Sequence, residues 1–299
     1  MTKNVLVELS DALADAAETA GKATVMVNAR RRMPASGIAY ATDLILTADH
    51  VIEREEDIKV TLADGTEIPA QIAGRDSGSD LAVLKLERAA ATVAEATNTA
   101  ARLGQIALVL GRPSTDGIEA SLGTVSAIGG PIRTGRGGML EKYIRTDGIS
   151  YPGFSGGPLV AADGTVLGLN TSGLANGAAV SIPADIAWRI ADTLSKHGRI
   201  KRGYLGIRSQ TVEIPNGTKS ALKRDQATGL LIVSVENDSP AAKGGLIVGD
   251  ILVAVASAPV LHHDELFARL NGDVVGKSTP VEILRGGQPQ TLKIVIGER

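Results

Sequence analysis

The chain has 299 residues, of which 43% are apolar and only 2% aromatic, and it carries a formal net charge of −2. This length suits two domains with cores of Val, Ile, Leu and Ala, and this charge gives no electrostatic reason to expect nucleic acid or an anionic membrane as a partner. The sequence has no cysteine, which excludes thiol nucleophiles, disulfides and zinc ribbons.

The first 22 residues predict a helix near residues 4–21. Leu6, Leu9, Leu13 and Ala16 recur at helical spacing, and their face packs on its own domain or, alternatively, forms an oligomer contact. Charged residues interrupt the segment throughout, so it is not a signal peptide, and no stretch of the chain is apolar for long enough to span a membrane. As it stands the sequence predicts a cytoplasmic protein, or a periplasmic or cell-envelope protein if a leader has been removed.

Short aliphatic runs fill the chain from residue 24 to about residue 182. The strands that they predict cover residues 23–28, 37–41, 44–48, 58–62, 81–86, 106–110, 121–128, 143–146, 166–169 and 178–182. Many short strands separated by glycine are typical of a barrel or a sandwich. Pro183 then begins a helix that runs to His197, and Gly198 ends it. The run Arg30-Arg31-Arg32 is interpreted as a solvated face at a strand end rather than a binding patch.

The pattern restarts after residue 201. Strands are predicted near residues 204–208, 230–236 and 251–256, helices at Ser239-Pro240 and residues 264–270, and a hairpin turns at Gly286-Gly287. We therefore expect an N-terminal helix over residues 1–22, a mostly β domain over residues 23–200 and a small α+β domain over residues 201–299.

Three residues of the first domain suggest nucleophilic catalysis. His50 is the one histidine of four in the β-rich part, and it follows the apolar run 44–48. Asp80 precedes the apolar run 81–86, where it suits a buried acceptor for the second imidazole nitrogen. Ser155 lies in Gly-Phe-Ser-Gly-Gly-Pro, and the chain order His, Asp, Ser is that of chymotrypsin-type barrels. We predict a chymotrypsin-like double β-barrel in which Ser155 is the nucleophile, His50 the base and Asp80 the orienting acid.

The glycines beside Ser155 predict an oxyanion hole. Gly153, Phe154 and Ser155 would form it, with the backbone amides of Gly153 and Ser155 as donors. A metal-dependent hydrolase is disfavoured because no His, Asp and Glu residues have ligand spacing, so we expect neither a metal nor a cofactor. A catalytically silent peptide-binding or chaperone-like module is the alternative hypothesis.

Three blocks resemble the signature blocks of the HtrA (Deg) family of trypsin-like serine proteases. They are residues 46–51, 79–85 and 153–159, and residues 201–207 resemble the junction into the PDZ domain of that family. The resemblance extends from about residue 23 to the end of the chain. It implies a double-barrel protease followed by an α+β PDZ-like domain. It also implies action on unfolded or damaged proteins in protein quality control, in trimers or larger homo-oligomers, without ATP or a metal.

The resemblance also implies which residues bind peptide. Asn170 and Thr171 would line the substrate cleft, and Ala179, Val180 and Ser181 the wall of the primary specificity pocket. Because these residues carry no charge, we expect small aliphatic side chains to be preferred over Lys or Arg. In the second domain the implied loop for a peptide C-terminal carboxylate is Tyr204, Leu205, Gly206 and Ile207, and the facing helix offers Leu266, Phe267 and Leu270.

The sequence departs from the family pattern around the nucleophile. Phe154 stands where the family usually has Asn, and Ser150-Tyr151-Pro152 replaces the usual Asn-Pro. No long insertion follows the early strands, so we expect no large loop that bridges subunits.

Overall fold

The computed structural model describes residues 4–134, 138–175, 178–214, 217–218, 222, 224–270 and 274–298. The chain divides into two compact units, Met1–Ile200 and Lys201–Arg299, which are described separately below. No helix in these described segments is both long and apolar enough to cross a membrane.

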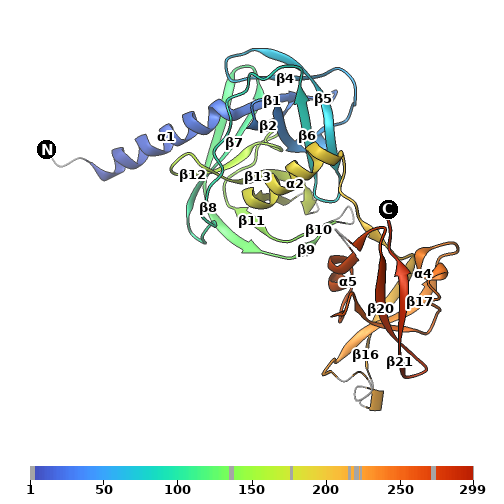
Figure 1. The fold of residues 1–299 in the computed structure, drawn as a ribbon. Helices are drawn as coiled ribbons and strands as arrows, with labels where there is room; N and C mark the ends of the chain where they lie inside the picture. The colour runs from blue at the N-terminus through green and yellow to red at the C-terminus, as the bar shows by residue number, and fades with distance from the viewer. Residues whose placement is uncertain are drawn as a thin grey trace. The chain divides into compact units, whose positions relative to one another are not determined.

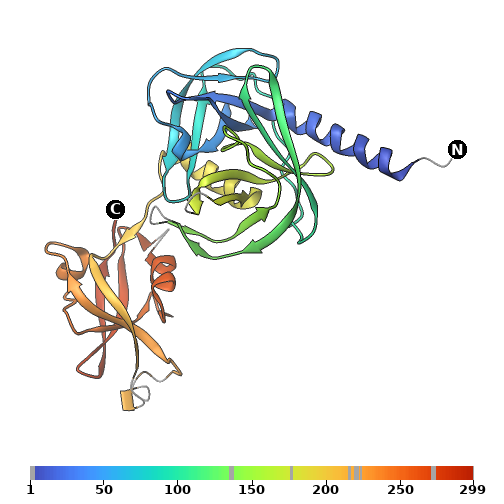
Figure 2. The ribbon, with the colours of Figure 1, turned by 180° about the vertical axis from the view of Figure 1, so that it is seen from behind.

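Helix α1 (Val5–Ala23) opens the first unit. The side chain of Asn4 caps it by accepting a hydrogen bond from the Leu6 N–H at 3.1 Å. The C-terminal half of α1 buries Ala16 and Ala20 against its own domain, whereas Val5 and Leu6 at the other end are exposed to solvent. Both ribbon views show this N-terminal half extending away from the barrels (Figures 1 and 2).

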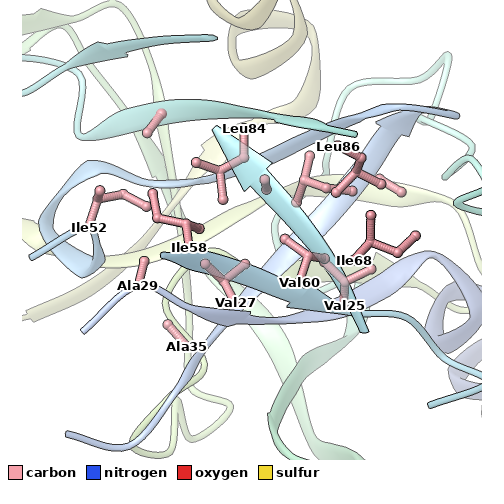
Figure 3. Close-up of a cluster of buried hydrophobic side chains, with 14 of the residues drawn as sticks. Val25, Val27, Ala29, Ala35, Ile52, Ile58, Val60, Ile68, Leu84 and Leu86 are labelled. Atoms are coloured by element: carbon pink, nitrogen blue, oxygen red, sulfur yellow. The ribbon is translucent and has the colours of Figure 1, made fainter. Parts of the chain in front are cut away.

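The first closed barrel has the strand order β1-β2-β3-β6-β5-β4. Its strands are β1 (Thr24–Asn28), β2 (Ala35–Ala41), β3 (Leu44–Ala48), β4 (Ile58–Thr61), β5 (Glu67–Asp76) and β6 (Leu81–Leu86). Side chains that alternate along these strands point inward and form an aliphatic core, which includes Val25, Val27, Ile58, Val60 and Ile68 (Figure 3). The interior of the barrel is therefore filled by aliphatic side chains, and polar functional groups lie at the ends of its strands.

The second closed barrel has the strand order β11-β14-β13-β12-β7-β8. Its strands are β7 (Ile106–Ser114), β8 (Gly117–Gly129), β11 (Tyr143–Thr146), β12 (Pro158–Ala161), β13 (Val166–Ala175) and β14 (Ala178–Pro183). A separate hairpin pairs β9 (Ile132–Arg133) with β10 (Met139–Leu140). The prediction of a mostly β, chymotrypsin-like double barrel is confirmed.

Helix α2 (Ala184–His197) packs against strands of both barrels. Ile186, Ala187, Ala191 and Leu194 on its buried face share one apolar cluster with β6 of the first barrel and with β13 and β14 of the second. Gly198 ends the helix at a φ of 74°, the left-handed conformation that glycine adopts without strain. This helix holds the two barrels together as one unit.

The second unit is built around the sheet β16-β17-β18-β20-β21, with β19 paired to β18. Its strands are β15 (Gly203–Tyr204), β16 (Ile207–Glu213), β17 (Thr228–Val235), β18 (Ile251–Val255), β19 (Ala258–Pro259), β20 (Ser278–Arg285), β21 (Gln288–Val295) and β22 (Gly297–Glu298). Its helices are α4 (Pro240–Lys243) and α5 (His263–Leu270). The α+β class predicted for this unit is confirmed.

Candidate active site

The pairing of β3 with β6 brings His50 to Asp80. Ala48 at the end of β3 pairs with Leu81 at the start of β6, so the residues just beyond each strand are neighbours. The Asp49 N–H donates to the Asp80 carbonyl oxygen at 3.0 Å, and a single turn of 3-10 helix, Asp49–Val51, then turns the His50 side chain out of the barrel wall.

The Asp80 carboxylate holds His50 at two points. Its Oδ2 lies 2.8 Å from Nδ1 of His50, and its Oδ1 accepts the His50 backbone N–H at 2.9 Å. The Asp80 side chain is fully buried, while that of His50 is 18% exposed. Thr171 on β13 also donates its hydroxyl to Oδ2 of Asp80, and the Gly173 N–H donates to the Thr171 hydroxyl at 2.9 Å. These hydrogen bonds fix the imidazole ring with its other nitrogen, Nε2, available to a substrate-side group.

Ser155 lies in the turn between β11 and β12. It lines, together with His50, a cleft of about 440 Å³. The Ser155 hydroxyl lies 3.3 Å from the hydroxyl of Ser172, and within the described residues no hydrogen bond joins it to His50. Such catalytic hydrogen bonds are often long in a protein without substrate, so the shared cleft is the relevant geometry.

The backbone amides of the oxyanion loop, residues 151–155, differ in whether they already donate a hydrogen bond within the protein. The Phe154 N–H donates to the Tyr151 carbonyl oxygen at 3.0 Å, whereas the amides of Gly153 and Ser155 donate to no group in the described part of the chain. Both of these residues line the cleft, and Gly153 has a φ of 91°, which favours glycine. Two unpaired backbone donors beside a serine hydroxyl can stabilise a developing oxyanion. The Phe154 side chain itself is fully buried in the second barrel.

The residues expected to form the specificity pocket point to different faces of β14, because successive side chains of a strand alternate in direction. Ala179 lines the cleft, but Val180 is buried in the apolar cluster beneath α2. The hydroxyl of buried Ser181 donates to Oδ1 of Asn170 at 2.7 Å, so these two side chains pair with each other. Of the five predicted residues, only Ala179 is among the described residues that line the cleft, and Thr171 instead contacts the Asp80 carboxylate.

Sequence reasoning missed other residues of the cleft. Ser172, Met33 and Tyr151 line it, as do Arg30 and Arg32 from the arginine run that was interpreted as a solvated face. Nε of Arg30 donates to the Met33 carbonyl oxygen at 2.5 Å, and burial lowers the pKa of its guanidinium. The described lining residues include no carboxylate, so a basic substrate side chain would find no anionic partner among them. The sequence shows that this arginine run directly follows β1. That the run faces the cleft is seen only in the folded structure.

The loop expected to bind a peptide carboxylate is tightly packed at Gly206. Its φ is 79°, and a Cβ placed there would lie 2.3 Å from Cβ of Ser239. Leu205 is buried in the domain core, as are Leu266 and Leu270 of α5, while Phe267 is half-buried. In the described sheet, β16 is an edge strand that follows this loop directly, the position that strand addition requires.

The described residues contain no group of three or more His, Asp or Glu side chains that could hold a metal ion. The cleft presents the Ser155 hydroxyl, the His50 imidazole held by Asp80, and the backbone amides of Gly153 and Ser155.

Comparisons with known proteins give a consistent result for both units. Residues 35–169 match the model of the trypsin-like peptidase domain, and residues 203–296 match that of the PDZ domain. A "Probable periplasmic serine endoprotease DegP-like" of Pseudomonas savastanoi pv. phaseolicola is 33% identical over 269 residues, which cover 88% of this chain and 55% of that protein. A protein of the same description from Rhizobium meliloti is 33% identical over 276 residues, which cover 90% of this chain and 54% of that protein. The chain thus spans about half the length of the curated relatives it matches.

Two solved structures are similar over almost the whole chain. The serine endoprotease from Yersinia pestis is 30% identical, with a TM-score of 0.80 and coverage of 96% of this chain and 98% of that one. The HtrA-type protease AlgW, solved with a decapeptide, is 26% identical, with a TM-score of 0.80 and the same coverage.

Proposed function

Because this chain belongs to the HtrA/DegP-like family of trypsin-like serine proteases with a PDZ domain, we propose that it is a serine endopeptidase. The observation that supports this most is the 2.8 Å contact between Nδ1 of His50 and buried Asp80, in a cleft shared with Ser155 and two unpaired amides.

The proposed reaction proceeds through an acyl-enzyme. The Ser155 hydroxyl attacks the scissile carbonyl carbon while Nε2 of His50 takes its proton, and Asp80 holds the opposite nitrogen in the protonated tautomer. The amides of Gly153 and Ser155 stabilise the negative charge on the carbonyl oxygen. The C–N bond then breaks as His50 returns the proton to the leaving amine. Water, activated by His50, next hydrolyses the ester and releases Ser155.

We propose unfolded or damaged polypeptides as substrates and peptide C-termini as ligands of the second unit. The open cleft and the edge strand β16 support this, since both accept an extended backbone. We further propose that the chain assembles as a homo-oligomer, for which a trimer is the expected state, and that it acts in the periplasm, the compartment named in the description of the curated relatives. Light scattering of the purified chain and fractionation of cells test these two points.

Hydrolysis of casein by wild type and by Ser155→Ala, without added metal or ATP, tests the proposed function. We expect cleavage by wild type and a loss of several orders of magnitude in the variant, as follows when a triad serine is removed. Equal cleavage by both proteins would contradict it. Cleavage by neither, with peptide binding intact, would favour the silent module.

A further inference from the structure

Phe154 stands between the two unpaired amide donors and is anchored in the core of the second barrel. Its side chain is fully buried in a cluster that includes Val109, Ile144 and Leu167. Its ring also meets that of Tyr151 edge to face, with the centroids 5.4 Å apart. Because Gly153 and Ser155 are its direct chain neighbours, a shift of the Phe154 backbone moves both donors.

Gly111 on β7 provides the space for this ring. A Cβ built on Gly111 would lie 2.5 Å from Cδ1 of Phe154, closer than nonbonded carbon atoms approach. Glycine at position 111 and phenylalanine at position 154 are therefore complementary in shape, although 42 residues separate them in the sequence.

Ser36 of the first barrel holds the same loop by hydrogen bonds. Its hydroxyl donates to the Gly153 carbonyl oxygen at 2.7 Å, and its backbone N–H donates to the Ser155 carbonyl oxygen at 3.1 Å. The hydroxyl also accepts the Arg112 N–H of β7 at 2.8 Å. Ser36 is fully buried, so water does not compete for these bonds.

We propose that Ser36 and Phe154 are positioning residues, which together hold the oxyanion loop, residues 151–155, in its donor geometry before substrate binds. The proposal rests on the proposed function. The apolar anchor fixes the loop from the second barrel, and the hydroxyl fixes it from the first. Neither side chain lines the cleft, so both act through the backbone of Gly153 and Ser155.

The test compares Phe154→Leu and Ser36→Ala with two control variants in the full chain. Ile68→Ala removes volume from the core of the first barrel, a cluster that does not contain Phe154. Thr279→Val removes a buried hydroxyl that donates to the Lys277 carbonyl oxygen in the second unit. Each protein is first checked for folding by circular dichroism. We then measure kcat and KM on a short peptide, and the affinity for a peptide boronate whose tetrahedral adduct places an oxygen in the oxyanion hole.

We expect Phe154→Leu and Ser36→Ala to lower kcat by at least about tenfold with KM within about twofold, because misplaced oxyanion donors act on the transition state alone. Boronate affinity should fall by the same factor, and both controls should stay within about twofold of wild type. Gly111→Ala should also lower kcat, and the smaller aliphatic side chain in Gly111→Ala/Phe154→Leu should restore part of that loss.

Wild-type kcat and boronate affinity in folded Phe154→Leu and Ser36→Ala would overturn the inference while leaving the proposed function intact. A loss of equal size in Ile68→Ala would overturn it as well, since the effect would then be a general loss of core packing. A wild type that neither hydrolyses peptides nor binds the boronate would instead contradict the proposed function.

Discussion

Nε of Arg75, on β5, donates to Oδ1 of Asp49 at 2.6 Å, and Asp49 is the residue that precedes His50. The Asp49 side chain is 2% exposed and that of Arg75 is 35% exposed. The same guanidinium reaches the carbonyl oxygens of Asp49 and Ile52 at 3.5 and 3.4 Å. The Arg75 side chain thus forms hydrogen bonds at both ends of the turn that carries His50.

Arg75→Ala should therefore impair catalysis as well as stability. It leaves the buried Asp49 carboxylate without its guanidinium donor, a loss of about 1–3 kcal/mol. We expect a lower kcat at nearly constant KM, with partial recovery in Arg75→Lys. Arg189→Ala is the matched control, because Arg189 pairs with Glu141 at the same 2.6 Å but both side chains are mostly exposed. Equal kcat in Arg75→Ala and in the control would contradict this account.

The hydroxyl of Thr171 should be required for full activity because it donates to Asp80. Thr171→Val keeps the shape but leaves the buried carboxylate with one donor fewer. Hydrogen bonds to charged groups contribute about 1.5–3 kcal/mol, so kcat should fall by about tenfold to a hundredfold. Thr171→Ser, which keeps the hydroxyl, should retain most of the activity. Steady-state measurement of kcat for the two variants tests this prediction. Equal kcat in Thr171→Val and Thr171→Ser would contradict a role for the hydrogen bond from Thr171 to Asp80.

Cleavage should favour small aliphatic residues before the scissile bond. Ala179 lines the cleft, and the charged side chains among its described lining residues are Arg30 and Arg32. A Lys or Arg side chain bound there would lose water without gaining an anionic partner, and desolvation of an unpaired charge is costly. Matched quenched peptides with Ala, Val, Lys or Arg at this position should show kcat/KM at least about tenfold lower for the basic residues. A preference for Lys or Arg would refute the prediction.

Arg285 should stabilise the second unit without affecting peptide hydrolysis. Its guanidinium binds both oxygens of the buried Asp250 carboxylate at 2.8 Å, and this contact raises the pKa of Arg285. Removing the guanidinium leaves the buried Asp250 carboxylate without this partner, which destabilises the second unit. Calorimetry of Arg285→Ala should show a lower Tm for the second unit with unchanged kcat on a short peptide. Lys59→Ala, which breaks an exposed ion pair with Glu67, should leave both quantities near wild type.

The sequence predicted the fold class and the site motifs because both depend on local patterns. The apolar runs 44–48 and 81–86 were expected as strands, and their pairing places His50 beside Asp80. Strand β5 was not expected, because Pro69 and the exposed polar residues Glu67 and Gln71 interrupt its apolar pattern. Strand β12 was missed because its four residues directly follow the glycine-rich turn.

Contacts across the barrels could not be predicted from such patterns. The burial of Phe154 depends on the absence of a side chain at Gly111, and the closing of the second barrel brings these positions together. The strand over residues 178–182 was expected, but which of its faces meets the cleft depends on the barrel interior. As a result Val180, expected in the pocket wall, lies in the core.

The most direct test of the central claim is labelling of Ser155 by a fluorophosphonate, followed by mass spectrometry of the intact and digested protein. An activated serine reacts with this probe, whereas an ordinary surface serine does not. We predict a single adduct that maps to Ser155, is absent from Ser155→Ala and forms much more slowly in His50→Ala. A folded wild type that forms no adduct at Ser155, or one that reacts equally well without His50, would contradict the claim that these residues form a working catalytic site.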